Sequence, residues 1–293
     1  MSNPLISITQ AETDDLLQTV NEKMLLGTFN ASDRQILQQM IECLGDARGM
    51  TRLRCAETLG AIGKPAIPFL LEALENHQNV VVRRAAAKTL TLIADPIAVP
   101  NLVRALLTDE DTVVKGSSVG ALAKTGEAAV PVLLEILASA EHPESTKGHA
   151  AWALAFIGAE AKEYLYPAIA SDSPEVRAAV VGAIAKVAQE DPKEDLFEIL
   201  LNALTDADEN VRCEAAAALG NLSYQPAIPN LVELLHHADG ESRKSAALAL
   251  MKVGDRAVIE PLQTALTQEP ETAVQQIIKL AIAQLEKLTN ELI

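Results

Sequence analysis

The segment Val211-Arg212-Cys213-Glu214-Ala215-Ala216-Ala217-Ala218-Leu219-Gly220 has counterparts at nearly regular intervals along most of the chain. In each counterpart, a basic residue is followed seven positions later by leucine or isoleucine. The basic residues are Arg52, Arg83, Lys115, Lys147, Arg177, Arg212 and Arg243, at intervals of 31, 32, 32, 30, 35 and 31, and Gln275 marks an eighth segment. Such a period predicts a stack of helical units, because each unit can bury its apolar face only against its neighbours.

A second series of residues indicates that each unit contains two helices. Leucine-rich stretches open at Pro68, Pro100, Pro131, Pro167, Pro229 and Pro261, and only Glu198 interrupts the series. Proline is favoured in the first turn of a helix, so these stretches predict first helices. In residues 113–125 apolar side chains recur at helical spacing and Gly126 follows, which predicts a second helix and its end. We therefore predict an all-α fold, a right-handed α-solenoid of about eight short two-helix repeats.

The two ends of the chain depart from the repeat. Residues 1–30 contain an amphipathic stretch, residues 14–26, which we expect to form an N-terminal helical cap over the first repeat. Residues 31–288 are predicted to form the solenoid as a single elongated domain, and residues 289–293 a C-terminal tail. In the last helix, Leu285 and Leu288 are expected to face inward.

Composition and charge narrow the class of function. Hydrophobic residues make up 49% of the 293 residues and aromatic residues only 3%, which suits closely packed helices. The net charge of −16 argues against binding to nucleic acid and favours a protein partner. No apolar run is long enough to cross a membrane, and residues 1–10 do not resemble a secretory signal, so we expect a cytoplasmic protein without membrane insertion.

Cysteine usage points the same way. Cys43, Cys55 and Cys213 form no C-x-x-C pair, which favours a reducing compartment. Cys55 stands where other repeats have alanine or serine, so we interpret it as a small core residue.

The recurrent basic residue also receives a structural interpretation. A cation near a helix N-terminus is locally unfavourable, so we expect it to bond the turn or the carbonyl groups of the preceding unit.

One face of the second helices is the candidate binding surface. Positions two, five and nine after the basic residue should lie away from the buried face and line a groove. The candidate groove residues are Arg54, Lys88, Ser117, Lys124, His149, Trp152, Phe156, Lys186, Asn221 and Lys252. This stripe is mildly basic in an acidic protein and holds the only tryptophan, with small residues such as Gly182 nearby. It would suit a flat apolar ligand with carboxylate groups, or an acidic helix with an aromatic anchor.

Two alternatives weaken this interpretation. Trp152 and Phe156 could instead pack under Tyr164 and Tyr166 as an aromatic core cluster, and the basic residues could be ordinary solvated positions. Known catalytic motifs are absent, so no catalytic residue is assigned. His236 and His237 project about 100° apart on a helix, so no metal site is predicted.

The valine-base pairs Val82-Arg83, Val114-Lys115, Val176-Arg177 and Val211-Arg212, with the alanine-rich helices after them, resemble HEAT repeats from about residue 34 to 288. The short alanine-rich form is similar to the phycobilisome-lyase type. The stretch His149-Ala150-Ala151-Trp152-Ala153-Leu154 resembles an aromatic helix of cyanobacterial bilin lyases.

This resemblance implies a function around phycobiliproteins in a cyanobacterial cytoplasm. It implies a factor that attaches or detaches an open-chain tetrapyrrole, or promotes antenna turnover, with phycobilin as a ligand and no permanently bound cofactor. The implied partners are phycobiliprotein subunits and a second HEAT-repeat chain. A non-enzymatic scaffold, for example in iron–sulfur protein assembly or other maturation, is the alternative, and the motifs do not separate the two.

Overall fold

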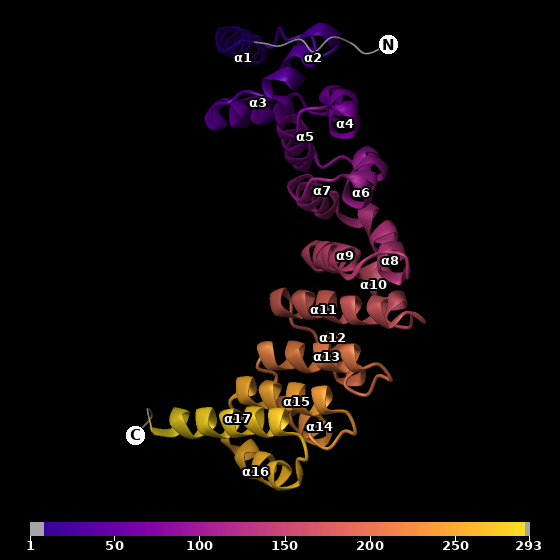
Figure 1. Ribbon diagram of the computed structural model, residues 1–293, viewed down its shortest axis with the longest axis vertical. Coiled ribbons are helices and arrows are strands. Elements are labelled where there is room, and N and C mark those ends of the chain that lie inside the picture. Colours follow the sequence, from indigo (N-terminus) through magenta and orange to yellow (C-terminus); the bar gives the residue numbers. More distant parts are fainter. Residues whose placement is uncertain (1–8, 291–293) are drawn as a thin grey trace. The chain divides into compact units, whose positions relative to one another are not determined.

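The computed structural model describes residues 9–290, with side chains described for residues 9–287. Every regular element in this range is helical, and no β-strand occurs in it (Figure 1). The prediction of an all-α fold is confirmed. Residues 1–8 of the predicted cap, residues 291–293 of the predicted tail and the side chain of Leu288 lie outside the described part.

The chain divides into two compact units, Met1–Val132 and Leu133–Ile293, with the boundary inside α8 (Val130–Ala138). The helices before α8 are α1 (Gln10–Leu25), α2 (Arg34–Cys43), α3 (Gly49–Ile62), α4 (Ile67–Asn76), α5 (Val80–Ile93), α6 (Val99–Thr108) and α7 (Thr112–Lys124). Those after it are α9 (Glu144–Ile157), α10 (Lys162–Ala168), α11 (Pro174–Glu190), α12 (Glu194–Ala203), α13 (Glu209–Asn221), α14 (Ile228–Leu234), α15 (Gly240–Val253), α16 (Ile259–Gln268) and α17 (Thr272–Asn290). From α2 onward, a short first helix alternates with a longer second helix, as the two series of residues predict.

The second helices form the continuous layer of each unit. In the first unit α3 packs on α5 and α5 on α7. In the second unit α9, α11, α13, α15 and α17 pack in that order, each on the next (Figure 1). The interval of 35 residues between Arg177 and Arg212 reflects the length of α11, which has 17 residues against 13 in α13.

Polar caps explain where the second helices begin. The side chain of Asp208 accepts hydrogen bonds from the backbone N–H groups of Asn210 and Val211, and Asp239 does the same for Glu241 and Ser242. Such caps satisfy donors that have no partner inside the helix. At the other end, Gly254 follows α15 with φ of 79°, a left-handed conformation that glycine adopts without strain.

The prolines open the first helices in most repeats. Pro68, Pro100 and Pro229 lie in the first turn of α4, α6 and α14, as predicted. The prediction for Pro167 is wrong, because this proline lies one residue before the end of α10 and opens no helix. A proline inside a helix removes a backbone donor and crowds the preceding turn, which agrees with α10 ending at Ala168.

The leucine or isoleucine seven positions after each basic residue builds the core. Seven of these side chains are buried, namely Leu59, Leu90, Leu122, Leu154, Ile184, Leu219 and Leu250, and Ile282 in α17 is half-buried. Cys55 is also fully buried, which confirms its interpretation as a core residue. Ser118 occupies the same repeat position as Cys55, and its hydroxyl is buried without a hydrogen-bond partner.

Helix α1 packs on α2 and α3 at the start of the first unit. Leu17 and Val20 are its buried apolar side chains, and the Thr9 hydroxyl caps its N-terminus. Arg48, just before α3, donates to the carboxylate of Asp14 at 2.9 Å and 3.0 Å. The amphipathic face predicted from residues 14–26 therefore covers the helices that follow, although Leu25 and Leu26 at its end are exposed.

Candidate functional site

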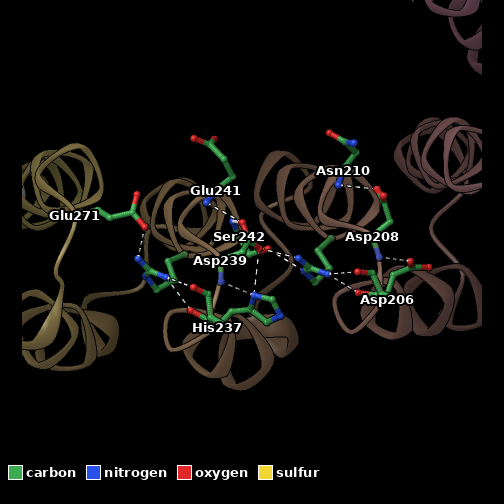
Figure 2. Close-up of polar contacts among 12 residues, drawn as sticks. Asp206, Asp208, Asn210, His237, Asp239, Glu241, Ser242 and Glu271 are labelled. Carbon is green, nitrogen blue, oxygen red and sulfur yellow. Dashed lines mark hydrogen bonds and ion pairs between the residues drawn. The ribbon is translucent and has the colours of Figure 1, made fainter.

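The basic residues that define the repeat hold neighbouring repeats together. In the second unit, Arg212 donates to the backbone carbonyl groups of Asp206 and Ala207 in the turn before its own helix. Its other nitrogens donate to Ser242 Oγ at 2.8 Å and to Asp239 at 2.7 Å in the following repeat (Figure 2). The predicted strut between repeats is confirmed, but its partners differ from the expected ones. The carbonyl groups lie in the turn of the arginine's own repeat, and the carboxylate belongs to the following repeat and not to the preceding one.

The same arrangement recurs at other repeats. Arg83 pairs with Asp109, Lys147 with Glu175, Arg177 with Asp206, and Arg243 with Glu269 and Glu271. Gln275 keeps the carbonyl contact of the series, because its side-chain amide donates to Glu269 O at 2.7 Å. The acidic residues named here therefore serve as partners of these struts.

The carboxylates of the struts are held in their charged form. Hydrogen bonds from Arg177 lower the pKa of Asp206, and those from Arg243 lower the pKa of Glu269. At Asp239 burial opposes ionisation, but hydrogen bonds from Ser242 and Arg212 outweigh it and leave the pKa well below its ordinary value. These carboxylates contribute to stability and not to acid–base chemistry.

The candidate groove residues of the first unit lie on the second helices, where the three basic side chains are exposed and Ser117 is half-buried. Arg54 is on α3, Lys88 on α5, and Ser117 and Lys124 on α7. Arg54 and Glu57 also line a polar hollow between α1 and α3, with a volume of about 790 Å³. The three basic side chains are accessible to solvent, as a surface that meets a partner requires, although exposure alone does not assign them that role.

In the second unit, the aromatic pair predicted to mark the groove is on the surface. Trp152 and Phe156 on α9 are 52% and 49% exposed, with ring centroids 5.5 Å apart and planes tilted by 32°. The alternative that these rings are sealed in an aromatic core under Tyr164 and Tyr166 is wrong. Tyr166 instead donates its hydroxyl hydrogen to Asp195 at 3.0 Å.

The remaining candidates of the second unit have local partners. Lys186 on α11 pairs with Glu190 and donates to Gln189 on the same helix. Lys252 on α15 donates to the side-chain oxygen of Asn221 on α13 at 2.6 Å. His149 is exposed on α9. These contacts hold Lys186, Lys252 and Asn221 against their own helices or the next one. His149 lies three residues before Trp152 on α9, so these two residues are neighbours on the helix surface.

A cavity of about 670 Å³ lies in the second unit, along α9, α11 and α13. Its apolar lining comes from Leu137, Gly148, Ala151, Ala155, Pro174, Ala178, Ala179 and Gly182, and its polar lining from Glu144, Lys147, Glu175, Asp208, Asn210 and Glu214. On α9 the small lining residues are one, four and eight positions after Lys147, whereas the predicted positions were two, five and nine. Trp152 therefore adjoins the lining residue Ala151 along α9 without itself lining the cavity.

The predicted groove positions include part of this cavity, because Ala179 and Gly182 on α11 and Glu214 on α13 stand two or five positions after the basic residue of their repeats. The lining residues on α9 were missed. The available signal was the run of glycine and alanine on α9 and α11, of which only part was noted beside the rings. Gly148 shows how open the space is, because a Cβ atom added there would meet nothing within 4 Å. Its volume lies within the range of roughly 300–1,000 Å³ that small-molecule sites occupy.

Two other kinds of site receive no support from the described residues. Among residues 9–287, no group of three or more His, Cys, Asp or Glu side chains is arranged to hold a metal ion. No helix within the described part of the chain combines the length and the apolar character that crossing a membrane requires.

The two-helix repeats, the struts between them and the layered second helices define an α-helical repeat protein. The family model for HEAT repeats matches residues 67–155, 131–202 and 197–283, and the model for the PBS lyase HEAT-like repeat matches residues 51–76. The chain belongs to the HEAT-repeat family.

Its relatives narrow the class further. The chain is 41% identical over 282 residues to the bilin biosynthesis protein MpeU of Synechococcus sp. (strain WH8020), covering 96% of this chain and 95% of the relative. It is 29% identical over 131 residues to the uncharacterized phycocyanin operon protein Z of Pseudanabaena tenuis (strain PCC 7409), covering 42% of this chain and 65% of that protein. The chain is thus a HEAT-repeat protein related to bilin biosynthesis proteins.

The fold is shared more widely. The karyopherin Kap121p, in a crystal structure with the extreme C-terminus of the protein phosphatase Cdc14p, aligns with a TM-score of 0.59 at 14% identity. The alignment covers 97% of this chain and 38% of Kap121p, so the chain spans well under half the length of that protein. At this level of identity the likeness concerns the fold alone.

Proposed function

We propose that this protein is a bilin-lyase-related factor, which holds an open-chain tetrapyrrole while the pigment is joined to, or released from, a cysteine of a phycobiliprotein subunit. The observation that carries the proposal is the relationship to a bilin biosynthesis protein at 41% identity over nearly the full length of both chains. The relative encoded with phycocyanin supports the same setting. On this proposal the protein acts in the cytoplasm of a cyanobacterium.

The attachment reaction requires correct positioning of the two reactants more than it requires acid or base groups. In attachment, the thiol of the acceptor cysteine adds across a carbon–carbon double bond of a bilin side chain. The sulfur bonds one carbon, the thiol hydrogen goes to the other, and no oxidant or reductant is consumed. Holding the two reactants in a productive geometry replaces a rare bimolecular encounter by an effectively unimolecular step. A HEAT-repeat surface without a catalytic motif is compatible with this demand.

The exposed rings of α9 are the proposed pigment platform. Trp152 and Phe156 offer aromatic area that is already half in water and packed ring against ring, so a flat conjugated ligand can cover it with little reorganisation. The basic residues of the first unit, Arg54, Lys88 and Lys124, are proposed to contact acidic groups of the protein partner. Lys186, Asn221, Lys252 and His149 stay in the proposed partner surface of the second unit, and Ser117 stays in that of the first unit.

The proposed partners are a phycobiliprotein subunit and, for full activity, a second HEAT-repeat chain. The test is co-expression of a phycobiliprotein subunit and bilin-producing enzymes with this protein, alone and with a candidate second chain. Covalent bilin is then measured by absorbance of the denatured subunit and by mass spectrometry. We expect attachment to depend on this protein and to fall at least tenfold in Trp152→Ala.

Leu280→Ala is the matched control, because Leu280 on α17 is an apolar side chain of the same 52% exposure in the same unit. Its attachment yield should equal that of the wild type. If the protein binds the subunit or the free pigment without changing the amount of covalent bilin, it is a non-catalytic scaffold. If it binds neither, the proposal is wrong.

A further inference from the structure

The cavity along α9, α11 and α13 contains four acidic side chains, and only one of them lacks a structural task. Glu175 pairs with Lys147 at 3.0 Å and accepts a hydrogen bond from Ser173. Asp208 caps α13, and Glu144 is strongly exposed beside Lys147, at 3.9 Å from it. No hydrogen bond or ion pair engages Glu214, the fourth carboxylate.

The surroundings of Glu214 are unusual for a carboxylate without a partner. It remains accessible to solvent, but the cavity walls displace part of the water around it, and this desolvation raises its pKa. Its carboxylate lies over Gly182 of α11, where an added Cβ atom would come within 2.9 Å of Oε1. The glycine thus provides the space that the carboxylate occupies, and a carboxylate without a protein partner faces an open cavity lined in part by alanine and glycine.

Such an acceptor suits a flat ligand that carries N–H donors at its centre and apolar rings around them. An open-chain tetrapyrrole has this chemistry, because its pyrrole N–H groups converge when the chain curls, and protonation gives them a positive charge. A carboxylate forms stronger hydrogen bonds to charged donors than to neutral ones, and more so where water is partly excluded. The alanine and glycine floor leaves the faces of the rings unobstructed.

We propose that this cavity binds the open-chain tetrapyrrole and that Glu214 accepts hydrogen bonds from its pyrrole N–H groups, across the cavity lining that includes Ala151. The inference rests on the proposed function and adds to it the pocket and the residue that orients the pigment. In this arrangement Glu214 is a positioning residue. It turns the pigment so that the reactive side chain at one end is presented to the partner.

The test is a titration of the full-length protein with a free phycobilin, followed by quenching of the single tryptophan and by the long-wavelength absorption band of the pigment. Glu214→Gln removes the charge and keeps the shape, and Gly182→Ala displaces the carboxylate while keeping its charge. Each should weaken binding by about tenfold or more. Glu214→Gln should also reduce the long-wavelength band of the bound pigment, which a merely structural role would not alter.

Two controls match these changes. Glu233→Gln makes the same substitution at an exposed position of α14, outside the cavity lining. Gly120→Ala makes the same change on α7, at the same repeat position as Gly182, and the added methyl group meets nothing within 4 Å. Both should bind the phycobilin as the wild type does. Circular dichroism of all four variants separates loss of binding from loss of folding.

The outcomes are distinguishable. If the wild type binds the phycobilin and both cavity variants bind it equally well with an unchanged spectrum, the assignment of Glu214 is overturned and the proposed function stands. If the wild type binds no phycobilin at concentrations where the pigment is soluble, the pigment-binding part of the proposed function fails, and the assignment fails with it.

Discussion

Arg243 on α15 donates from Nε and Nη2 to the two carboxylate oxygens of Glu269, each at 2.7 Å, and Glu269 lies in the turn that precedes α17. The Arg243 and Glu269 side chains are 9% and 2% exposed, so the pair is screened little by water. Bidentate geometry of this kind combines charge with a fixed direction. The pair therefore ties one repeat to the next at a defined angle.

Replacement of Arg243 by alanine should lower the free energy of unfolding by about 3–5 kcal/mol, because Glu269 is then left buried and uncompensated. Arg256→Ala, at an exposed position at the start of the 3₁₀ helix before α16, should change it by about 0.5 kcal/mol or less. Urea unfolding followed by circular dichroism measures both. Equal effects of the two variants would show that the struts contribute little.

Ser118 predicts a stabilising substitution. Its hydroxyl is fully buried on α7 without a hydrogen-bond partner, and the corresponding positions of other repeats hold small residues such as Ala86 and Ala150. Ser118→Ala should raise the free energy of unfolding by about 1 kcal/mol, since it removes an unsatisfied polar group and leaves the packing almost unchanged. Thermal unfolding would contradict this if the variant melted below the wild type.

Replacement by alanine should have opposite effects on stability at two of the glycines. A Cβ atom on Gly220 of α13 would lie 2.8 Å from the Cα atom of Ala249 on α15, so Gly220→Ala should force the helices apart and cost about 1–3 kcal/mol. A Cβ atom on Gly116 of α7 would meet nothing within 4 Å. Gly116→Ala should therefore stabilise the protein by about 0.5–1 kcal/mol through helix propensity. Denaturation midpoints of the two variants on opposite sides of the wild type are the expected result.

Acidification should lower the stability of the second unit. The pKa values of Asp206, Asp239 and Glu269 lie below their ordinary values, so at mildly acidic pH the folded state binds fewer protons than the unfolded chain. Their contribution to stability is fully present above about pH 5 and is lost as the pH falls through about 4 and below. Glu214, with a raised pKa, acts in the opposite direction but is outnumbered.

Urea unfolding between pH 7 and pH 3 measures this dependence. Glu269→Gln should be less stable than the wild type at pH 7 and should lose less stability on acidification, because one of the linked groups no longer titrates. A free energy of unfolding that stays constant down to pH 3 in the wild type would show that the struts do not perturb these carboxylates.

Trp152 should matter little for stability. Because its ring is half exposed, Trp152→Ala is expected to cost about 1 kcal/mol or less, whereas Leu154→Ala, two residues later at a fully buried position, should cost about 2–5 kcal/mol. A large loss of stability in Trp152→Ala would show that this ring has a structural role. It would also remove the reason for assigning the ring to a pigment surface.

The period of the sequence was sufficient to predict much of the fold. The recurring basic residue and the aliphatic residue seven positions later predicted all-helical repeats, the buried leucines such as Leu219, and an arginine strut between repeats. These features follow from helix geometry and from the need of each repeat to cover the apolar face of the next, so one chain contains them in its spacing. Pro167 departs from the pattern because α10 begins at Lys162, before the proline, and ends one residue after it.

Which residues line the candidate site depends on how one helix packs against another. Periodicity within α9 separates a buried side from an exposed side, but the rotation of α9 relative to α11 decides which exposed positions border a cavity. That rotation is set by side chains on both helices, so Gly148 and Ala151 line the cavity while Trp152 lies beside it. For the same reason Glu214 meets Gly182, which is 32 residues away in the chain and adjacent in space. Spacing in the chain therefore establishes the repeat, whereas the contacts between repeats establish which side chains share a pocket.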